Sequence, residues 1–208
     1  PVIFLSDGYV ANGSEPWRFP KAADLPFIEK PVATEADKNG DKFEPYTRDE
    51  RLVRKWVLPG QEGFQNRIGG LEKEAVTGNV SYDPANHERM VQTREQKVQY
   101  VAENIPAQDL DNGPNSGEVL LLGWGSTYGV LKSATEHLLE EGYAVAHAQV
   151  KYLKPLPRNL ENILKRFDHV IVPENNNGQF VNVIRSTYLV PAIPFTKVQG
   201  IPFTVNEI

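Results

Sequence analysis

The strongest constraint on the fold is the alternation of short apolar runs with helical patterns in residues 118–188. Continuous apolar runs are typical of strands that are covered on both faces. The strand candidates are residues 119–122, 144–150 and 170–172. The helix candidates follow them, with apolar stripes at residues 130–138, 157–167 and 179–188. Strands and helices in this order predict an α/β domain with a parallel sheet and right-handed crossovers, over residues 116–208.

Apolar residues at helical spacing also predict which side chains of these helices are buried. Val130, Leu131, Ala134 and Leu138 form the first stripe, and Gly142 ends that helix. The inward residues of the other two helices are Leu160, Ile163, Leu164, Phe167, Phe180, Val183 and Ile184. The strand at residues 144–150 contains His147, which we expect to be a core residue.

The preceding residues divide into two regions. Residues 1–17 contain an apolar run at residues 2–5, which predicts a buried strand that ends in a turn at Ser6-Asp7-Gly8. A buried strand at the beginning of the chain indicates that residues 1–17 are the end of a larger domain. The chain is therefore predicted to be part of a longer polypeptide. Asp7 is interpreted as a turn cap.

Residues 18–115 are predicted to be an irregular linker. Its prolines exclude a long helix before Gly60. One helix is expected near residues 84–103, with Asp83 as N-cap and Pro84 in the first turn. The apolar residues of that helix, together with Arg94, share one face: Met90, Val91, Val98 and Val101. Residues 108–117 are rich in Asp, Asn, Gly and Pro and are predicted to connect it to the last domain.

Composition excludes several classes of function. The net charge is −5, so no basic surface favours nucleic acid. No apolar run is long enough to cross a bilayer, which predicts a cytoplasmic protein without membrane contact. The chain has no cysteine, so a thiolate-bound iron–sulfur cluster must be held by another chain. The 4 histidines are scattered without metal-ligand spacing, and no metal site is predicted.

Two turns lie where an α/β sheet binds ligands, beyond the carboxyl ends of strands. In the first turn Gly123, Gly125, Ser126 and Thr127 precede a helix, whose free N–H groups could hold a phosphate or carboxylate. The alternative, which we favour, is that the glycines form the turn and a hydroxyl caps the helix. The third glycine of the pattern is Gly129, which does not match the dinucleotide-binding fingerprint.

The second turn is the asparagine-rich segment at residues 174–178. Asparagine tolerates turn geometry and caps helices, so a plain turn is the favoured interpretation. The functional alternative is a polar rim in which Asn175 and Asn176 contact a partner chain. No Gly-Asp-Gly motif precedes these asparagines, so they are not expected to bind the magnesium of thiamine diphosphate.

Several longer motifs resemble the alpha subunits of 2-oxoacid:ferredoxin oxidoreductases, particularly those that use 2-oxoglutarate. The match spans essentially the whole chain and is similar to the C-terminal part of such subunits. The motifs are SDGYVANGSEPW (6–17), PGQEGF (59–64), GGLE (69–72), DPANH (83–87), GWGST (123–127), YLKPLP (152–157) and KVQGIPF (197–203).

The resemblance implies domains and partners. Residues 1–17 would end a domain that binds the pyrimidine ring of thiamine diphosphate, and residues 116–208 would resemble the C-terminal domain of transketolases. The parent complex would contain a beta subunit, thiamine diphosphate, magnesium, an iron–sulfur cluster and coenzyme A, and it would make succinyl-CoA and reduce ferredoxin. The resemblance assigns no catalytic residue to this chain, which is expected to be inactive alone. The rival interpretation is a non-catalytic assembly or anion-binding module.

The linker is unusually rich in aromatic residues for a disordered segment. They are Trp17, Phe19, Phe27, Phe43, Tyr46, Trp56 and Phe64. Large aromatic side chains are enriched where proteins meet. We therefore predict an interface element, with Trp17, Trp56 and Phe64 as its anchors. The alternative is that these side chains fold back on the chain itself.

Overall fold

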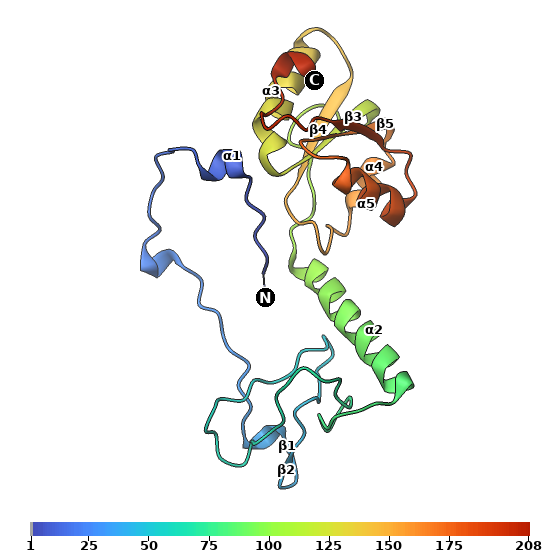
Figure 1. Ribbon diagram of the computed structural model, residues 1–208. Helices are drawn as coiled ribbons and strands as arrows, with labels where there is room; N and C mark the ends of the chain where they lie inside the picture. Colours follow the sequence, from blue (N-terminus) through green and yellow to red (C-terminus); the bar gives the residue numbers. More distant parts are fainter. Residues whose placement is uncertain (1) are drawn as a thin grey trace. The chain divides into compact units, whose positions relative to one another are not determined.

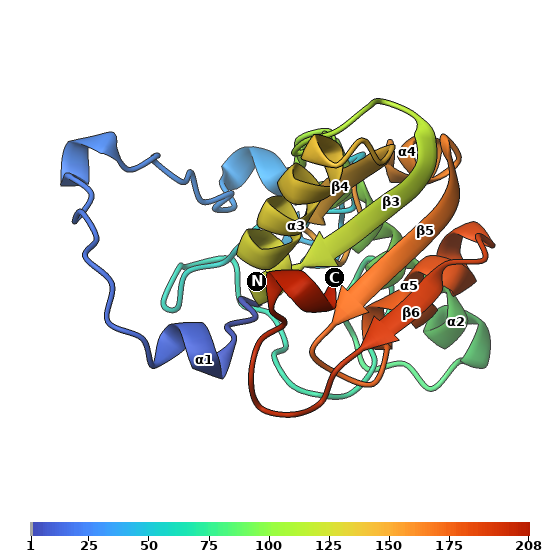
Figure 2. The same ribbon diagram turned by 90° about the horizontal axis from the view of Figure 1, so that it is seen from above.

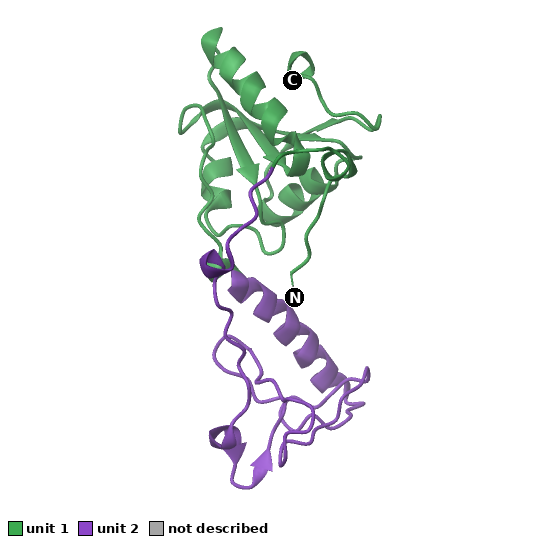
Figure 3. Ribbon diagram, turned by 90° about the vertical axis from the view of Figure 1, so that its left-hand side faces the viewer, with its two compact units in different colours: residues 1–16, 102–208 green, residues 17–101 purple. Residues whose placement is uncertain are grey.

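The computed structural model describes residues 2–208, and these form two compact units (Figure 3). Unit 1 combines residues 2–16 with residues 102–208, and unit 2 comprises residues 17–101. Each unit has its own buried residues and is described separately. The division differs from the predicted one, because residues 102–115 pack with the α/β domain and not with the linker.

The centre of unit 1 is a four-stranded parallel sheet in the order β4-β3-β5-β6. Figure 1 labels β3, β4 and β5, and Figure 2 also labels β6. Its strands are β3 (Gly117–Trp124), β4 (Val145–Val150), β5 (Phe167–Glu174) and β6 (Ile193–Thr196). Leu120 of β3 pairs with Ala146 on one side and Val170 on the other. The predicted α/β class with a parallel sheet is confirmed.

Helices cover both faces of this sheet (Figure 2). One face carries α3 (Tyr128–Glu140), with a core around Leu121, Leu131 and Val145. The other carries α4 (Leu160–Leu164) and α5 (Gln179–Tyr188) over the larger core. The fully buried side chains of that core include Leu120, Leu122, Leu160, Leu164, Val172 and Ile184. Helices cover both faces of the central strands, which explains why β3 and β4 are rich in buried apolar residues.

Two predicted elements differ from the structure in this region. The helix expected at residues 157–167 is confined to α4, because Phe167 pairs with Gly117 and starts β5. Of the predicted inward residues on α5, Val183 is 40% exposed and Val181 is buried in its place. Strand β6 was not predicted: it is short, contains Pro194 and lies at the sheet edge, where proline is tolerated.

Residues 108–113 are not a free linker. Asp111 N–H donates to the carbonyl of His147 at 2.8 Å, and His147 N–H donates to the carbonyl of Asn112 at 3.0 Å. The side chain of Asp111 also accepts from Gln149 N–H at 2.7 Å. These bonds satisfy the outer edge of β4, which would otherwise be an unpaired strand edge. The Asp, Asn, Gly and Pro residues of this segment suggested a connector. The same turn-forming residues also suit a segment that hydrogen-bonds to a strand edge.

The predicted strand at residues 2–5 does not form. Val2, Ile3 and Phe4 are 96%, 86% and 86% exposed, and no strand of residues 2–208 pairs with them. A strand is stable when neighbouring strands accept and donate its backbone hydrogen bonds. The turn after it is helical: α1 (Gly8–Ala11) begins at Asp7, whose carboxylate accepts from Tyr9 N–H at 2.8 Å. The capping role predicted for Asp7 is confirmed.

Unit 2 is largely irregular and its last helix is α2 (Pro84–Tyr100). The 3-10 turn at Val101–Asn104 follows, and the chain passes into unit 1 at Ala102 within that turn. As predicted, Asp83 is the N-cap and Pro84 lies in the first turn. The other elements are β1 (Lys38–Asn39), β2 (Lys42–Phe43) and 3-10 turns at Ala22–Asp24 and Glu35–Asp37. Met90 is the one buried residue of the expected apolar face of α2, and Val91 and Val98 remain exposed.

Candidate functional site

The sheet order places the two candidate turns beside each other. β3 leads through α3 to β4 on one side, and the chain then returns to form β5 on the other side of β3. The carboxyl ends of β3 and β5 therefore flank the point where the strand order reverses, which is the usual ligand position in open α/β sheets. The first turn follows β3 and the second follows β5. The sequence predicted both turns but not their proximity.

The buried carboxylate of Glu174 fills this position. Glu174 is the last residue of β5 and has an exposed fraction of 0%. Its oxygens accept from Phe180 N–H and Val181 N–H, each at 2.8 Å, in the first turn of α5. They also accept from Trp124 Nε1 at 3.2 Å and Asn176 Nδ2 at 3.0 Å. The N-terminus of α5 is thus occupied by a carboxylate of the chain itself.

Trp124 joins the two turns across the strand ends. Its indole donates to Glu174, and its ring centroid lies 5.8 Å from that of Phe180. The backbone N–H of Trp124 donates to the hydroxyl of Thr127, and that hydroxyl donates to the Trp124 carbonyl at 2.9 Å. Thr127 is buried, so its hydroxyl is committed to closing the turn. The favoured interpretation, a hydroxyl that caps the helix, is not what the structure has, because the N-cap of α3 makes no side-chain hydrogen bond.

The glycines of the first turn are required by packing and by backbone geometry. A Cβ on Gly123 would lie 2.4 Å from Gln149 Oε1 and 2.5 Å from Leu131 Cδ1. Gly125 has a φ of +59°, which glycine adopts without strain. Its carbonyl accepts from Gln149 Nε2 at 2.9 Å. Both glycines therefore have a structural reason that needs no ligand.

Ser126 contacts a segment far away in the sequence. Its hydroxyl donates to the carboxylate of Asp7, the N-cap of α1. This bond, followed by the one from Tyr9 N–H, lowers the pKa of Asp7 below its ordinary value, so the carboxylate is ionised at neutral pH. A negative charge beside this turn opposes the binding of a second anion. The predicted anion site at Gly123, Gly125, Ser126 and Thr127 stays a prediction that this geometry disfavours.

The asparagines of the second turn are engaged within the chain. Asn176 Oδ1 accepts from Gly178 N–H at 2.8 Å and Gln179 N–H at 2.9 Å, which caps α5. Asn175 Nδ2 donates to the Ile201 carbonyl at 3.5 Å. These contacts are those of the plain-turn interpretation. The alternative, that Asn175 and Asn176 contact a partner chain, stays a prediction.

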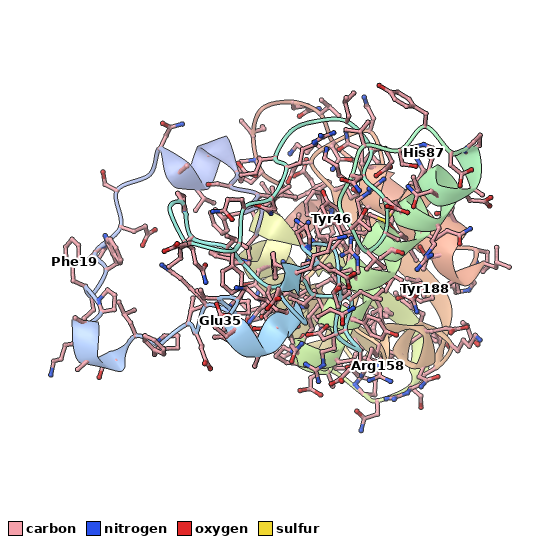
Figure 4. The ribbon with its side chains drawn as sticks, turned by 90° about the horizontal axis from the view of Figure 1, so that it is seen from below. Phe19, Glu35, Tyr46, His87, Arg158 and Tyr188 are labelled. Carbon is pink, nitrogen blue, oxygen red and sulfur yellow. The ribbon has the colours of Figure 1, made fainter. Side chains whose placement is uncertain are left out.

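The predicted interface aromatics fall into two groups. Trp17 and Trp56 are 70% and 55% exposed, and the rings of Trp17 and Phe19 lie 4.8 Å apart. The Phe19 side chain projects away from its segment (Figure 4). Phe64 is different: it is 2% exposed, its ring centroid lies 5.0 Å from that of Phe43 in a tilted arrangement, and the ammonium of Lys38 lies over its ring. Phe64 therefore belongs to the core of unit 2, and its prediction as an interface anchor is corrected.

His147 lies in the core, as expected. Its exposed fraction is 0%, and Nε2 lies 3.4 Å from Gln149 Oε1. Burial is the main cause that lowers the pKa of His147, against the opposing charge of Asp111. Nδ1 has no hydrogen-bond partner within residues 2–208, so the side chain is only partly satisfied.

No helix in the described part of the chain is long and apolar enough to span a membrane.

Comparison with known proteins identifies the family. The chain is 44% identical over 209 residues to the 2-oxoglutarate oxidoreductase subunit KorA of Mycobacterium tuberculosis, covering 100% of this chain and 31% of that protein. It is 32% identical over 196 residues to subunit alpha of 2-oxoacid:ferredoxin oxidoreductase 1 of Aeropyrum pernix, which is 88% of this chain and 29% of that one. No family model matches the chain.

A solved structure agrees with these relatives. The 2-oxoglutarate:ferredoxin oxidoreductase of Magnetococcus marinus, with 2-oxoglutarate, coenzyme A and succinyl-CoA bound, matches with a TM-score of 0.80 and 31% identity. The match covers 90% of this chain and 32% of that one. The chain spans about a third of the length of the relatives it matches. It belongs to the 2-oxoacid:ferredoxin oxidoreductase alpha-subunit family, as its motifs predicted.

Proposed function

We propose that the chain is a non-catalytic, assembling part of the alpha subunit of a 2-oxoglutarate:ferredoxin oxidoreductase. The complete enzyme would convert 2-oxoglutarate and coenzyme A to succinyl-CoA and carbon dioxide, and two electrons would pass to ferredoxin. The observation that carries this proposal is the 44% identity to the KorA subunit over the whole chain. The filled ligand position at Glu174 supports the assembling role, because the fold's usual binding point is used for internal packing.

The cofactors of such an enzyme are assigned to other parts of the complex. Thiamine diphosphate binds with magnesium, and the chain has no Gly-Asp-Gly motif to hold that ion. An iron–sulfur cluster needs thiolates, and the chain has no cysteine. The residues present do not fit either group. The proposed partner is therefore a beta subunit that holds the cluster and passes electrons to ferredoxin.

An activity assay tests this proposal. The 208-residue chain, the complete alpha subunit with its beta subunit, and the beta subunit alone are each supplied with 2-oxoglutarate, coenzyme A and thiamine diphosphate. Reduction of a viologen dye is followed. We expect turnover with the assembled subunits and none with the chain alone or the beta subunit alone. Turnover by the isolated chain would refute the non-catalytic assignment, and an assembled enzyme without 2-oxoglutarate activity would refute the substrate.

A further inference from the structure

An Asn-Gly dipeptide lies at the tip of the β1–β2 hairpin in unit 2 (Figure 1). The hairpin pairs Asn39 with Lys42, so Gly40 and Asp41 form a two-residue turn. Gly40 has a φ of +62°, which glycine adopts without strain. No third strand of residues 2–208 pairs with these two. A two-stranded ribbon is only marginally stable, so this turn opens more readily than the sheet of unit 1.

The side chain of an asparagine lies within reach of the next backbone nitrogen. When that N–H loses its proton to solvent, the nitrogen can attack the carboxamide carbon. A C–N bond forms, the bond to the amide nitrogen breaks, and ammonia leaves a cyclic succinimide. Water then opens the ring at either carbonyl and gives aspartate or isoaspartate, so water is the sole co-reactant. The attack is intramolecular, and a following glycine favours it because no Cβ obstructs the nitrogen.

Both reacting groups are accessible at the hairpin tip. Asn39 and Gly40 are exposed, and a Cβ built on Gly40 would meet no atom within 4 Å. Within residues 2–208, neither the Gly40 N–H nor the Asn39 carboxamide has a hydrogen-bond partner. The nucleophile and the carboxamide carbon therefore meet without breaking an internal contact.

The Asn-Gly pair at residues 12–13 is also exposed, but hydrogen bonds hold both of its groups. Asn12 Nδ2 donates to the Gly8 carbonyl at 2.7 Å, and Gly13 N–H donates to the Val10 carbonyl at 3.2 Å. Both bonds close the end of α1, and both must break before the ring can form. The cost of breaking two hydrogen bonds slows the reaction by about tenfold.

The two remaining Asn-Gly pairs lie within the folded α/β domain. Gly178 is buried, and its N–H donates to Asn176 Oδ1 at 2.8 Å. Asn112 has a buried Oδ1, and its Nδ2 donates to the Lys132 carbonyl at 3.4 Å. Ring closure at either pair requires the surrounding backbone to open. The fold therefore protects these pairs and leaves the hairpin tip reactive.

We propose that Asn39 is a site of spontaneous deamidation, at which ring closure with Gly40 yields aspartate and isoaspartate. The isoaspartyl product lengthens the backbone by a carbon after residue 39, which disturbs the pairing of Lys38 with Phe43. The Phe43 ring centroid lies 5.0 Å from that of the buried Phe64. The modification therefore loosens the core of unit 2 as well as adding a negative charge. The proposal is independent of the oxidoreductase function.

Peptide mapping by mass spectrometry tests the site. The folded 208-residue chain and the same chain unfolded in guanidinium chloride are incubated at mildly alkaline pH in ¹⁸O-labelled water. We expect Asn39 to react at rates within about threefold of each other in the two states, whereas folding slows Asn112 and Asn177 by about tenfold or more. Hydrolysis of the succinimide should place ¹⁸O in both products at Asn39.

Two results would overturn the site: protection of Asn39 by folding as strong as that of Asn177, or an aspartyl product with no isoaspartate beside it. Thermal unfolding of the purified isoaspartyl chain tests the structural effect. It should melt ~4 °C or more below the wild type, because the packing around Phe43 is disturbed. Asn39→Asp is the matched control, since it carries the same charge on an unaltered backbone, and it should melt as the wild type does. Equal melting of the isoaspartyl chain and Asn39→Asp would refute the effect on packing.

Discussion

Replacing Glu174 by alanine should strongly destabilise unit 1. The carboxylate is the common acceptor for two backbone N–H groups of α5, the Trp124 indole and the Asn176 amide. Alanine removes the acceptor but leaves the donors of Phe180 and Val181, both buried residues, without a partner. Both donors lie in buried residues, so solvent replaces the lost acceptor only in part.

The magnitude follows from these contacts. A buried donor without a partner costs ~1–3 kcal/mol, and hydrogen bonds to a charged group are at the strong end of the range. Asn176 is half-exposed and can bond to water, so it adds little. Removing the charge also relieves the cost of burying it, which offsets part of the loss. We expect a net loss of ~3–5 kcal/mol in the free energy of unfolding, as for other broken buried charge networks.

Urea unfolding measured through Trp124 isolates this effect. The chain has 3 tryptophans, so a Trp17→Phe/Trp56→Phe background leaves Trp124 as the fluorophore of unit 1. Glu161→Ala is the control, because its ion pair with Lys165 is exposed and worth ~0.5 kcal/mol or less. If Glu174→Ala lost under ~1 kcal/mol, or no more than the control, the carboxylate would not anchor the two turns, and the reasoning would be refuted.

Three further predictions concern other parts of the chain. Gly113→Ala should cost at least ~1 kcal/mol more free energy of unfolding in urea than Gly142→Ala. Both glycines have φ near +90°, but only a Cβ on Gly113 would lie 2.4 Å from the Val145 carbonyl oxygen. Equal losses would contradict the packed edge of β4. Hydrogen bonding from Lys197 is the main cause that lowers the pKa of Glu207 to about 2. The stability that this ionised carboxylate gives unit 1 should therefore be present above pH 4.5 and lost toward pH 2. An unchanged dependence of the unfolding free energy on pH in Glu207→Gln would disprove this. Trp56→Ala should weaken the binding free energy to the proposed beta subunit, measured by calorimetry, by ~2 kcal/mol or more. The backbone hydrogen bonds of residue 56 to Pro31 and Ala33 remain, so the melting temperature should be unchanged. Normal association with a lowered melting temperature would favour internal packing.

Local signals in the sequence determined most of the secondary structure. The predicted bounds of α5 agree with the structure, and Asp83 and Pro84 start α2 as expected. Periodicity, N-caps and prolines act over a few residues, so they can be interpreted without knowledge of the fold. The family motifs belong to the same class of evidence, and the relatives confirm the family that the motifs predicted.

Only the tertiary structure decided which segments meet. Trp124 and Glu174 are 50 positions apart, and Asp7 and Ser126 are 119 apart. No local pattern encodes such contacts, because they depend on strand order and on which partners a segment finds. The same reason explains residues 2–5: their composition favours a strand, but a strand needs neighbours. The sequence alone therefore determined most of the elements and the family, whereas the strand order decided that Glu174 fills the expected ligand position.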